Sequence, residues 1–141
     1  MRSLMRKYLL LFIFVVATTS FAQTLTFCEK VSEKGSPINE ATVFNIPKGG
    51  GYFYFLVNLP YTVGCEEAYF DIYRLDNYDP NYPSMEGEGE SFETTISTAT
   101  KPDWVWFYKQ VTFYKTGYYR VYVRDCGDSF LASGVVQIKL K

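Results

Sequence analysis

Apolar and polar residues alternate most regularly in the run GYYRVYVRD, which spans residues 117–125. Successive side chains of a strand point to opposite faces, whereas a helix would spread both sets around its circumference. One face of this run is apolar and suited to a core: Tyr119, Val121 and Val123. The other face carries phenol and guanidinium tips that we expect to stay in contact with water: Tyr118, Arg120, Tyr122 and Arg124.

The same period of two predicts further strands at residues 24–31, 41–46, 52–59, 68–75, 92–98 and in the last residues up to 141. Polar stretches that contain glycine or proline separate these runs, and no segment has a convincing helical period. In the run at 24–31, Leu25 and Phe27 share one side and Cys28 lies on the other. The side chains expected to face the core in the other runs are Phe53, Phe55, Val57, Leu59, Ala68, Phe70, Ile72, Val136, Ile138 and Leu140. Seven or eight strands without a helix predict an all-β fold, either a sandwich or a barrel.

The segment from Trp104 to Phe113 is extended but its period breaks. If Phe107, Val111 and Phe113 face inward, Lys109 does so too; if the two indoles and Tyr108 face inward, Gln110 and Thr112 follow. A bulge near Lys109 would allow both ends to bury their rings. The pattern leaves the choice open, and we favour burial of the indoles because large aromatic side chains are usually buried.

The motif Gly117-x-Tyr119-x-Val121 resembles the start of strand F in immunoglobulin-like sandwiches. There, a tyrosine just after a turn glycine donates its hydroxyl to the backbone at a corner of the fold. The resemblance covers residues 117–125 alone, and Val121 stands where antibody domains have a cysteine. It implies a two-sheet antiparallel immunoglobulin-like β-sandwich, which we prefer to a barrel. A motif of this kind carries no activity.

That resemblance also implies a pairing for two of the three cysteines, Cys28, Cys65 and Cys126. In such a sandwich Cys65 follows the second main strand and Cys126 follows the sixth, so both lie at the same end. We therefore expect a Cys65–Cys126 disulfide, with Cys28 free and buried on the first strand. Three reduced, partly buried thiols remain the alternative. The scattered cysteines do not match the spacing of a zinc site.

The first 22 residues have the pattern of a secretory signal peptide. Arg2, Arg6 and Lys7 precede a short apolar run, and Ser20-Phe21-Ala22 supplies a small-x-small cleavage site. We expect cleavage to leave residues 23–141 as a single β-sandwich domain in the periplasm or outside the cell, with no membrane insertion afterwards. An uncleaved anchor is the alternative, although the run is short for a membrane span.

Charge and aromatic content narrow the range of partners. The predicted signal peptide contains three of the 14 basic residues, so 11 remain against 15 acidic ones and the mature net charge is 11 − 15 = −4. This charge argues against nucleic acid or anionic lipid as a partner. Aromatic residues make up 19% of the chain, which predicts a core built largely from rings.

The composition also disfavours catalysis. The chain has no histidine, so it lacks the Ser–His and Cys–His pairs of common hydrolases. We expect no enzymatic activity and no cofactor. Four carboxylates in the polar stretch 76–91 form a weak candidate for a Ca²⁺ site, although their spacing matches no EF-hand: Asp76, Asp79, Glu86 and Glu88.

Two surfaces are candidates for binding. The first is a flat, tyrosine-rich face that forms if the strands at 68–75 and 117–124 are neighbours. We expect an Asp71–Arg120 pair on it. Its candidate binding residues are Tyr69, Tyr73, Tyr118, Arg120 and Tyr122. The alternative without a binding role is an ordinary sheet face exposed to solvent. The second surface depends on the direction of the two indoles, Trp104 and Trp106. If they point outward with Tyr52, Tyr54 and Tyr108, these side chains form an exposed aromatic platform.

These patterns lead to two functional hypotheses from different classes. The first is an exported, non-catalytic β-sandwich module that binds a protein partner through an aromatic sheet face. The alternative is a carbohydrate-binding module that stacks sugar rings on Trp104 and Trp106.

Overall fold

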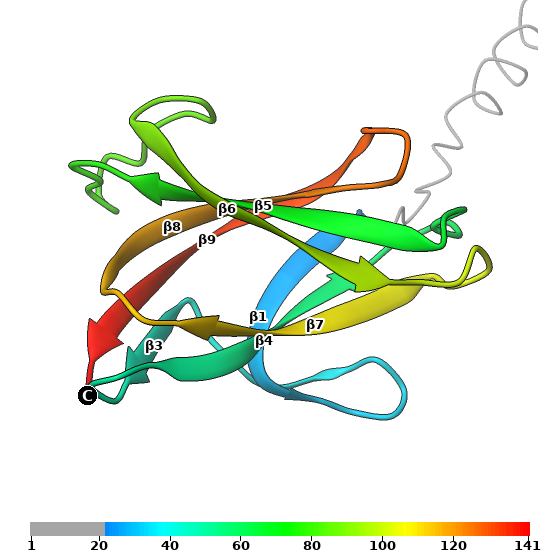
Figure 1. Ribbon diagram of the computed structural model, residues 1–141, viewed down its shortest axis with the longest axis horizontal. Helices are drawn as coiled ribbons and strands as arrows, with labels where there is room; N and C mark the ends of the chain where they lie inside the picture. Colours follow the sequence, from blue (N-terminus) through cyan, green and yellow to red (C-terminus); the bar gives the residue numbers. More distant parts are fainter. Residues whose placement is uncertain (1–21) are drawn as a thin grey trace, which may run out of the picture.

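Two β-sheets face each other in the computed structural model, which describes residues 22–141 (Figure 1). The predicted signal peptide, residues 1–22, lies outside the described residues apart from Ala22. The first sheet has four strands in the order β2 (Pro37–Glu40), β1 (Thr24–Val31), β4 (Gly51–Asn58) and β7 (Trp106–Phe113). The second has five, in the order β3 (Val43–Ile46), β9 (Phe130–Leu140), β8 (Gly117–Arg124), β5 (Glu67–Leu75) and β6 (Glu90–Ala99).

The strand order confirms the immunoglobulin-like sandwich. Strands β1, β4 and β7 follow the A-B-E order of that fold, and β9, β8 and β5 follow its G-F-C order. All neighbours pair antiparallel except β3 and β9, which are parallel. The nine strands exceed the seven or eight expected because Pro37–Glu40 forms β2. All four β2 residues are exposed, so no apolar pattern marks the strand, and its pairing with β1 creates it.

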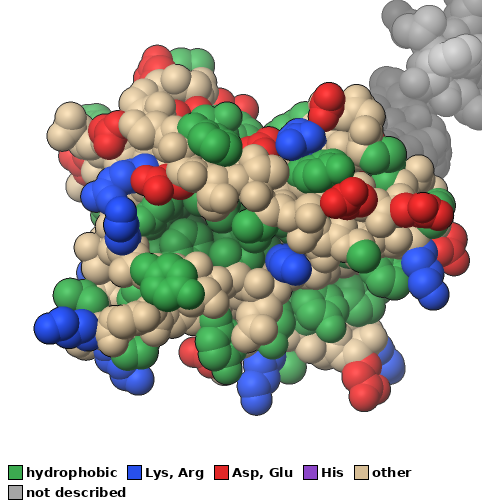
Figure 2. Space-filling model, in the orientation of Figure 1, with side chains coloured by type: hydrophobic (Ala, Val, Ile, Leu, Met, Phe, Trp, Pro, Cys, Tyr) green, Lys and Arg blue, Asp and Glu red, His purple; other side chains and the backbone are tan. Residues whose placement is uncertain are grey.

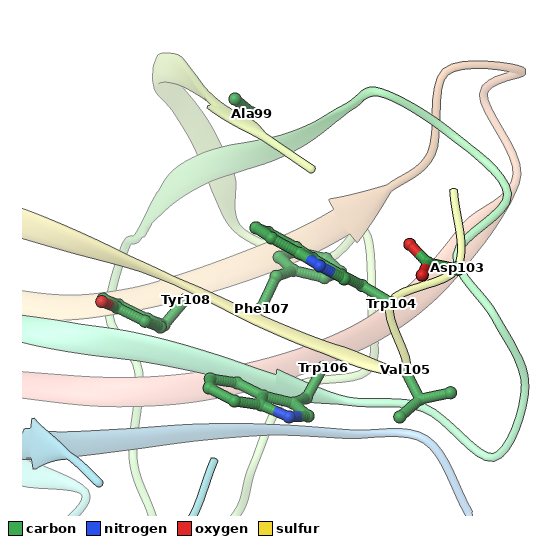
Figure 3. Close-up of a pocket in the computed structure, with 7 residues that line it drawn as sticks. All are labelled: Ala99, Asp103, Trp104, Val105, Trp106, Phe107 and Tyr108. Carbon is green, nitrogen blue, oxygen red and sulfur yellow. The ribbon is translucent and has the colours of Figure 1, made fainter. Parts of the chain in front are cut away.

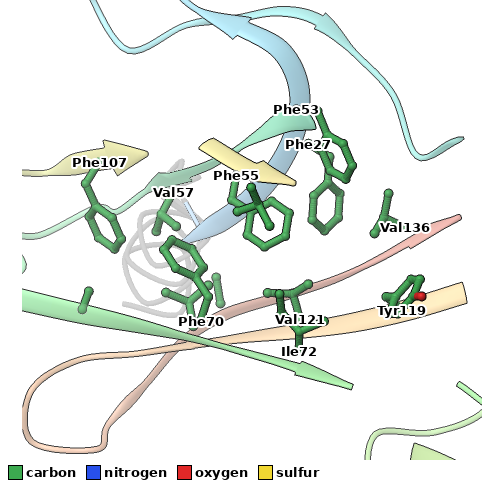
Figure 4. Packing of buried hydrophobic residues seen from close by; sticks show 14 of the residues in the cluster. Phe27, Phe53, Phe55, Val57, Phe70, Ile72, Phe107, Tyr119, Val121 and Val136 are labelled. Atoms are coloured by element: carbon green, nitrogen blue, oxygen red, sulfur yellow. The ribbon is translucent and has the colours of Figure 1, made fainter. Parts of the chain in front are cut away.

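The core lies between the sheets and consists largely of phenylalanine rings (Figure 4). Phe53 stacks between Phe44 and Phe113, with ring centroids 4.0 and 5.2 Å away. The predicted inner faces of β4, β5 and β8 are confirmed, and Tyr119, Val121 and Val123 are all buried. The prediction for Leu140 is wrong: its side chain is 61% exposed because it lies at the end of the last strand, where the opposite layer no longer covers it.

Two tertiary contacts implied by the resemblance are present. The Tyr119 hydroxyl donates to the carbonyl of Lys115 over 2.9 Å and closes the predicted corner. A disulfide joins Cys65 to Cys126, which fits an oxidising compartment, and Cys28 is free and buried as expected. Residues 22–141 contain no helix with the length and hydropathy needed to cross a bilayer.

The hairpin formed by β1 and β2 folds across the outer face of the four-stranded sheet (Figure 1). Its turn brings Gly35 against the indole of Trp106: a Cβ at Gly35 would lie 2.5 Å from the ring. Cys28 and Leu56 also lie on this outer face, yet both are fully buried. Part of the outer face is therefore a second, smaller packed layer, and Trp106 lies at its margin.

Candidate functional site

The first candidate surface, here called the β5–β8 face, is the outer side of these two neighbouring strands. The register places Asp71 opposite Tyr122 and Tyr73 opposite Arg120. The expected Asp71–Arg120 pair is therefore wrong. Asp71 instead accepts a hydrogen bond from Nε of Arg124 over 2.9 Å, and Arg120 pairs with Glu90 over 3.0 Å.

Arg120 is buried, contrary to the prediction that it meets water. Residues 76–89 fold back over β8 and cover it, so that only 5% of Arg120 is exposed. Its guanidinium donates to the carbonyl oxygens of Ser84 and Met85 over 2.8 and 3.1 Å, and to the Glu90 carboxylate. Backbone carbonyls and one carboxylate thus replace water around the charge.

Tyr122 and Glu90 complete this buried network. The Tyr122 hydroxyl donates to the same oxygen of Glu90 that Arg120 contacts. Burial and the hydrogen bond to Glu90 raise the pKa of Tyr122 to about 12. Burial alone would raise the pKa of Glu90, but the hydrogen bonds from Tyr122 and Arg120 outweigh it and hold that pKa below its ordinary value. The carboxylate therefore stays charged at neutral pH and anchors the loop.

The rest of the β5–β8 face is also paired within the chain. The Arg124 guanidinium lies 4.4 Å from the ring centroid of Tyr69 and pairs with both Asp71 and Asp128. Tyr73 packs edge to face against Tyr122, with ring centroids 5.5 Å apart, and Tyr118 packs on Tyr78 of the loop. The structure thus brings all five predicted residues of this face together, but Arg120, Tyr122 and Tyr69 direct their polar groups to Ser84, Met85, Glu90 and Glu67 of the protein itself.

The four candidate Ca²⁺ ligands do not converge on one point. Asp76 and Glu86 accept hydrogen bonds from the hydroxyls of Ser91 and Ser133 over 2.7 and 3.0 Å. Asp79 and Glu88 accept from backbone N–H groups within the loop. In the part of the chain that the structure describes, no three histidine, cysteine, aspartate or glutamate side chains gather at a spacing that suits a metal ion.

The second candidate surface, here called the aromatic surface, surrounds the start of β7 and comprises Tyr54, Trp104, Val105, Trp106 and Tyr108; Tyr52, which the sequence grouped with them, lies opposite Thr112 near the other end of β7. Pairing between β4 and β7 is continuous, so no bulge occurs near Lys109. Phe107, Val111 and Phe113 face inward, and strict alternation then places Trp106 and Tyr108 outside. The preference for buried indoles is wrong: Trp104 is 38% exposed, and Trp106 is half-buried.

The two indoles border a hollow of about 650 Å³ (Figure 3). They lie on opposite sides of the backbone, with the ring of Trp106 nearly parallel to that of Tyr108, at 15° and 6.1 Å between centroids. Tyr54 meets Tyr108 edge to face at 5.8 Å. Asp103 contributes a carboxylate to the wall of the hollow. The chemistry offered is apolar contact and ring stacking beside one negative charge.

Backbone hydrogen bonds connect the turn before β7 to the disulfide. The N–H groups of Val63 and Gly64 donate to the carbonyls of Trp104 and Pro102 over 2.7 and 2.9 Å. The hydroxyl of Thr100 donates to the carbonyl of Cys65 over 2.6 Å. Trp104 is therefore held by a loop that the Cys65–Cys126 bridge ties to the opposite hairpin.

Sequence reasoning missed Glu90 and Gly35, the residues that organise the two surfaces. Glu90 is one of several acids in a polar stretch, and no local pattern marks it as the buried partner of Arg120. Gly35 occupies a turn, where its positive φ of 81° is an ordinary use of glycine. Both roles depend on contacts between segments far apart in the chain.

No family model and no curated protein matches the sequence. Solved structures with some similarity include a CARDB domain from Pyrococcus furiosus in complex with di-metal ions, which is 10% identical with a TM-score of 0.39 and covers 87% of this chain and 100% of that one. Another is an immunoglobulin-like protein from Pseudomonas aeruginosa, 16% identical with a TM-score of 0.43, covering 86% of this chain and 100% of that one. At these scores the fold assignment rests on the strand order and the Tyr119 corner.

Proposed function

We propose that this chain is an exported, non-catalytic binding module that recognises a protein partner through the aromatic surface at β7. The observation that carries the proposal is the exposure of Trp104, Val105 and Tyr108, at 38, 45 and 47%, around a single hollow. Contiguous apolar patches of this kind mark interaction sites. Tyrosine and tryptophan supply large contact areas with few rotatable bonds to immobilise, and they dominate binding hot spots.

Export is part of this proposal and has support of its own. The basic residues and apolar run before Ala22 match a signal peptide, and a disulfide suits the periplasm or the extracellular space. N-terminal sequencing of the exported protein should give Gln23 as the first residue. Recovery of a chain that still begins with Met1 would contradict export by cleavage.

A carbohydrate ligand is the second candidate, and one specific observation favours it. Trp106 and Tyr108 present nearly parallel rings, with Trp104 across the hollow, an arrangement on which a sugar ring could stack. Specific pockets, however, also place several polar groups around their ligand. The hollow offers Asp103 as its charged group beside mostly apolar walls, so the protein partner is favoured.

Site-specific cross-linking separates these candidates. A photoreactive residue at position 108, on the aromatic surface, should capture a defined protein in the exported fraction, whereas the same residue at position 69, on the β5–β8 face, should not. Trp104→Ala should abolish that capture with little change in stability, because the indole is partly exposed. Glycan-array binding that is lost in Trp104→Ala would instead establish the carbohydrate candidate. Capture at position 69 that survives Trp104→Ala would reject the aromatic surface.

A further inference from the structure

A groove opens between β6 and β7, the edge strands of the two layers, with a volume of about 320 Å³. In Figure 1, β6 and β7 approach each other toward the turn that connects them and diverge away from it, and Figure 2 shows hydrophobic side chains between the two layers on this face. Core side chains form its floor: Ile72, Ile96, Val111, Phe113 and Tyr119. The Thr98 hydroxyl, which donates to the Tyr108 carbonyl over 3.4 Å, closes one end.

Both walls of the groove are unpaired strand edges. Within residues 22–141, β7 pairs with β4 alone and β6 pairs with β5 alone. The outer edge of such a strand presents unpaired N–H and C=O groups that can form a ladder with an incoming strand. In sandwiches with the A-B-E-D order, a fourth strand lies beside strand E. Because β7 occupies the E position here, the place of that fourth strand is open.

Glu93, Lys109 and Lys115 are the charged residues that line the groove, and of these Lys109 belongs to the inner face of β7. Lys109 lies opposite Phe55, in line with Phe107 and Val111, and its side chain is half-buried. None of the three ion pairs formed by the described residues includes Lys109. An inward-facing charge on an edge strand repels a wholly apolar strand. It would attract a strand that brings a carboxylate to the same depth.

We propose that this groove binds an extended peptide segment of a partner protein, which adds to β7 as an antiparallel strand. Alternate residues of the peptide then point between the layers. Apolar side chains opposite Phe113 and Val111 cover the floor, and an Asp or Glu opposite Lys109 pairs with its ammonium group. The recognised pattern is apolar-x-apolar-x-acidic. The groove is a separate surface from the aromatic surface, so this inference stands or falls independently of the proposed function.

A designed peptide tests the pattern directly. The probe is acetyl-Thr-Val-Thr-Val-Thr-Glu-Thr-Ser-amide, titrated into the ¹⁵N-labelled protein and followed by NMR. Amide shifts should concentrate in residues 109–115, and hydrogen exchange of β7 amides that do not donate to β4 should slow as the new ladder forms. Shifts confined to the aromatic surface, or no shifts at millimolar peptide, would overturn the proposal.

A charge swap supplies the decisive control. Lys109→Glu should weaken binding of the Glu-containing peptide roughly tenfold, and a peptide with Lys in place of Glu should recover that loss. Lys30→Glu makes the same charge change on exposed β1 and should leave both affinities unchanged. Equal affinity of wild type and Lys109→Glu for the Glu peptide would refute the assigned register. Self-association of the protein through the groove, seen by sedimentation, would refute a peptide partner as occupant.

Discussion

The β5–β8 face and the aromatic surface at β7 both carry large side chains with phenol or indole rings, yet they do opposite things with them. On the first, Arg120 and Arg124 take all their charged partners from the chain itself. On the second, Trp104 and Tyr108 remain substantially exposed around a hollow. A face that looks rich in recognition chemistry can thus be engaged in holding its own loop, while the rings at another edge keep much of their surface exposed.

The physical reason is the different cost of leaving each kind of group without a partner. A buried guanidinium without compensation costs several kcal/mol, so the fold surrounds Arg120 with Glu90 and two carbonyls. An exposed ring costs far less, because the loss is hydrophobic and distributed over its area. Unused apolar area is therefore the more informative sign of a partner. Four predictions test this contrast, beginning with the largest effect.

Arg120→Ala should destabilise the protein by about 3–5 kcal/mol, because it leaves the Glu90 carboxylate buried without its cation. Urea denaturation measures this loss, and limited proteolysis should show cleavage within residues 76–89. Arg124→Ala is the matched control: that arginine is more exposed, at 31% of its side chain, and should cost about 1 kcal/mol or less. Equal losses for the two variants would contradict the assignment of Arg120 as the loop's anchor.

Replacing Cys65 and Cys126 together by serine should cost on the order of 4 kcal/mol, since the bridge closes a sequence separation of 61 residues. Because this bridge ties down the loop that holds Trp104, tryptophan emission should also shift to longer wavelength, while the contact between Arg120 and Glu90 persists. Cys28→Ala leaves the bridge intact and should not shift the emission. An unchanged spectrum in the double variant would show that Trp104 is positioned without the disulfide.

Acidification should loosen the β5–β8 face before it affects the aromatic surface. The pKa of Glu90 is lowered on folding, so its contribution to stability is complete above the ordinary value of 4.5 and is lost as the pH falls below it. The loss should be smaller than for Arg120→Ala, because a protonated carboxyl still forms hydrogen bonds. As the pH is lowered through and below 4.5, the melting temperature of Glu90→Gln should fall less steeply than that of the wild type. A parallel slope in that variant would assign the acid sensitivity to other carboxylates.

Tyr119→Phe should have the smallest effect, about 1 kcal/mol, because it removes one hydrogen bond and retains the packing of the ring on Phe113. Tyr119 also lines the floor of the groove between β6 and β7. Because phenylalanine keeps the ring there, peptide binding in the groove should survive the change. Denaturant midpoints compare it with wild type. An unchanged midpoint would show that the hydrogen bond from Tyr119 to Lys115 does not stabilise the corner.

Much of the fold could be predicted from alternation along single strands. The inner residues of β4, β5 and β8 are each apolar at every second position, and the core uses them as expected. The corner bond of Tyr119 and the Cys65–Cys126 bridge followed from the resemblance in strand F. Strand β2 was not predicted, because its four residues are all exposed and show no alternation of apolar and polar side chains.

The candidate sites were harder to predict, because they depend on contacts over long sequence distances. Alternation correctly placed Arg120 on the outer face of β8, but it carried no information that residues 84–90 would fold over that face. The predicted Asp71–Arg120 pair is wrong for a related reason: the register between β5 and β8 places Tyr122 opposite Asp71, two positions from Arg120, and Asp71 pairs with Arg124 instead. A shift of two residues retains the face and changes the partner, so facial patterns cannot distinguish the two.

Local chemistry along this chain thus specified most of the residues that enter strands, the apolar side of the regular ones and the turns between them, because steric and hydrophobic preferences act over a few neighbouring positions. The exposure of the indoles, the burial of Arg120 and the open groove beside β7 arose when distant segments met. Strand pairing, loop docking and the folding of the β1–β2 hairpin over Leu56 are interactions between segments far apart in the sequence. Their outcome depends on competition among many partners, which no single stretch of sequence records.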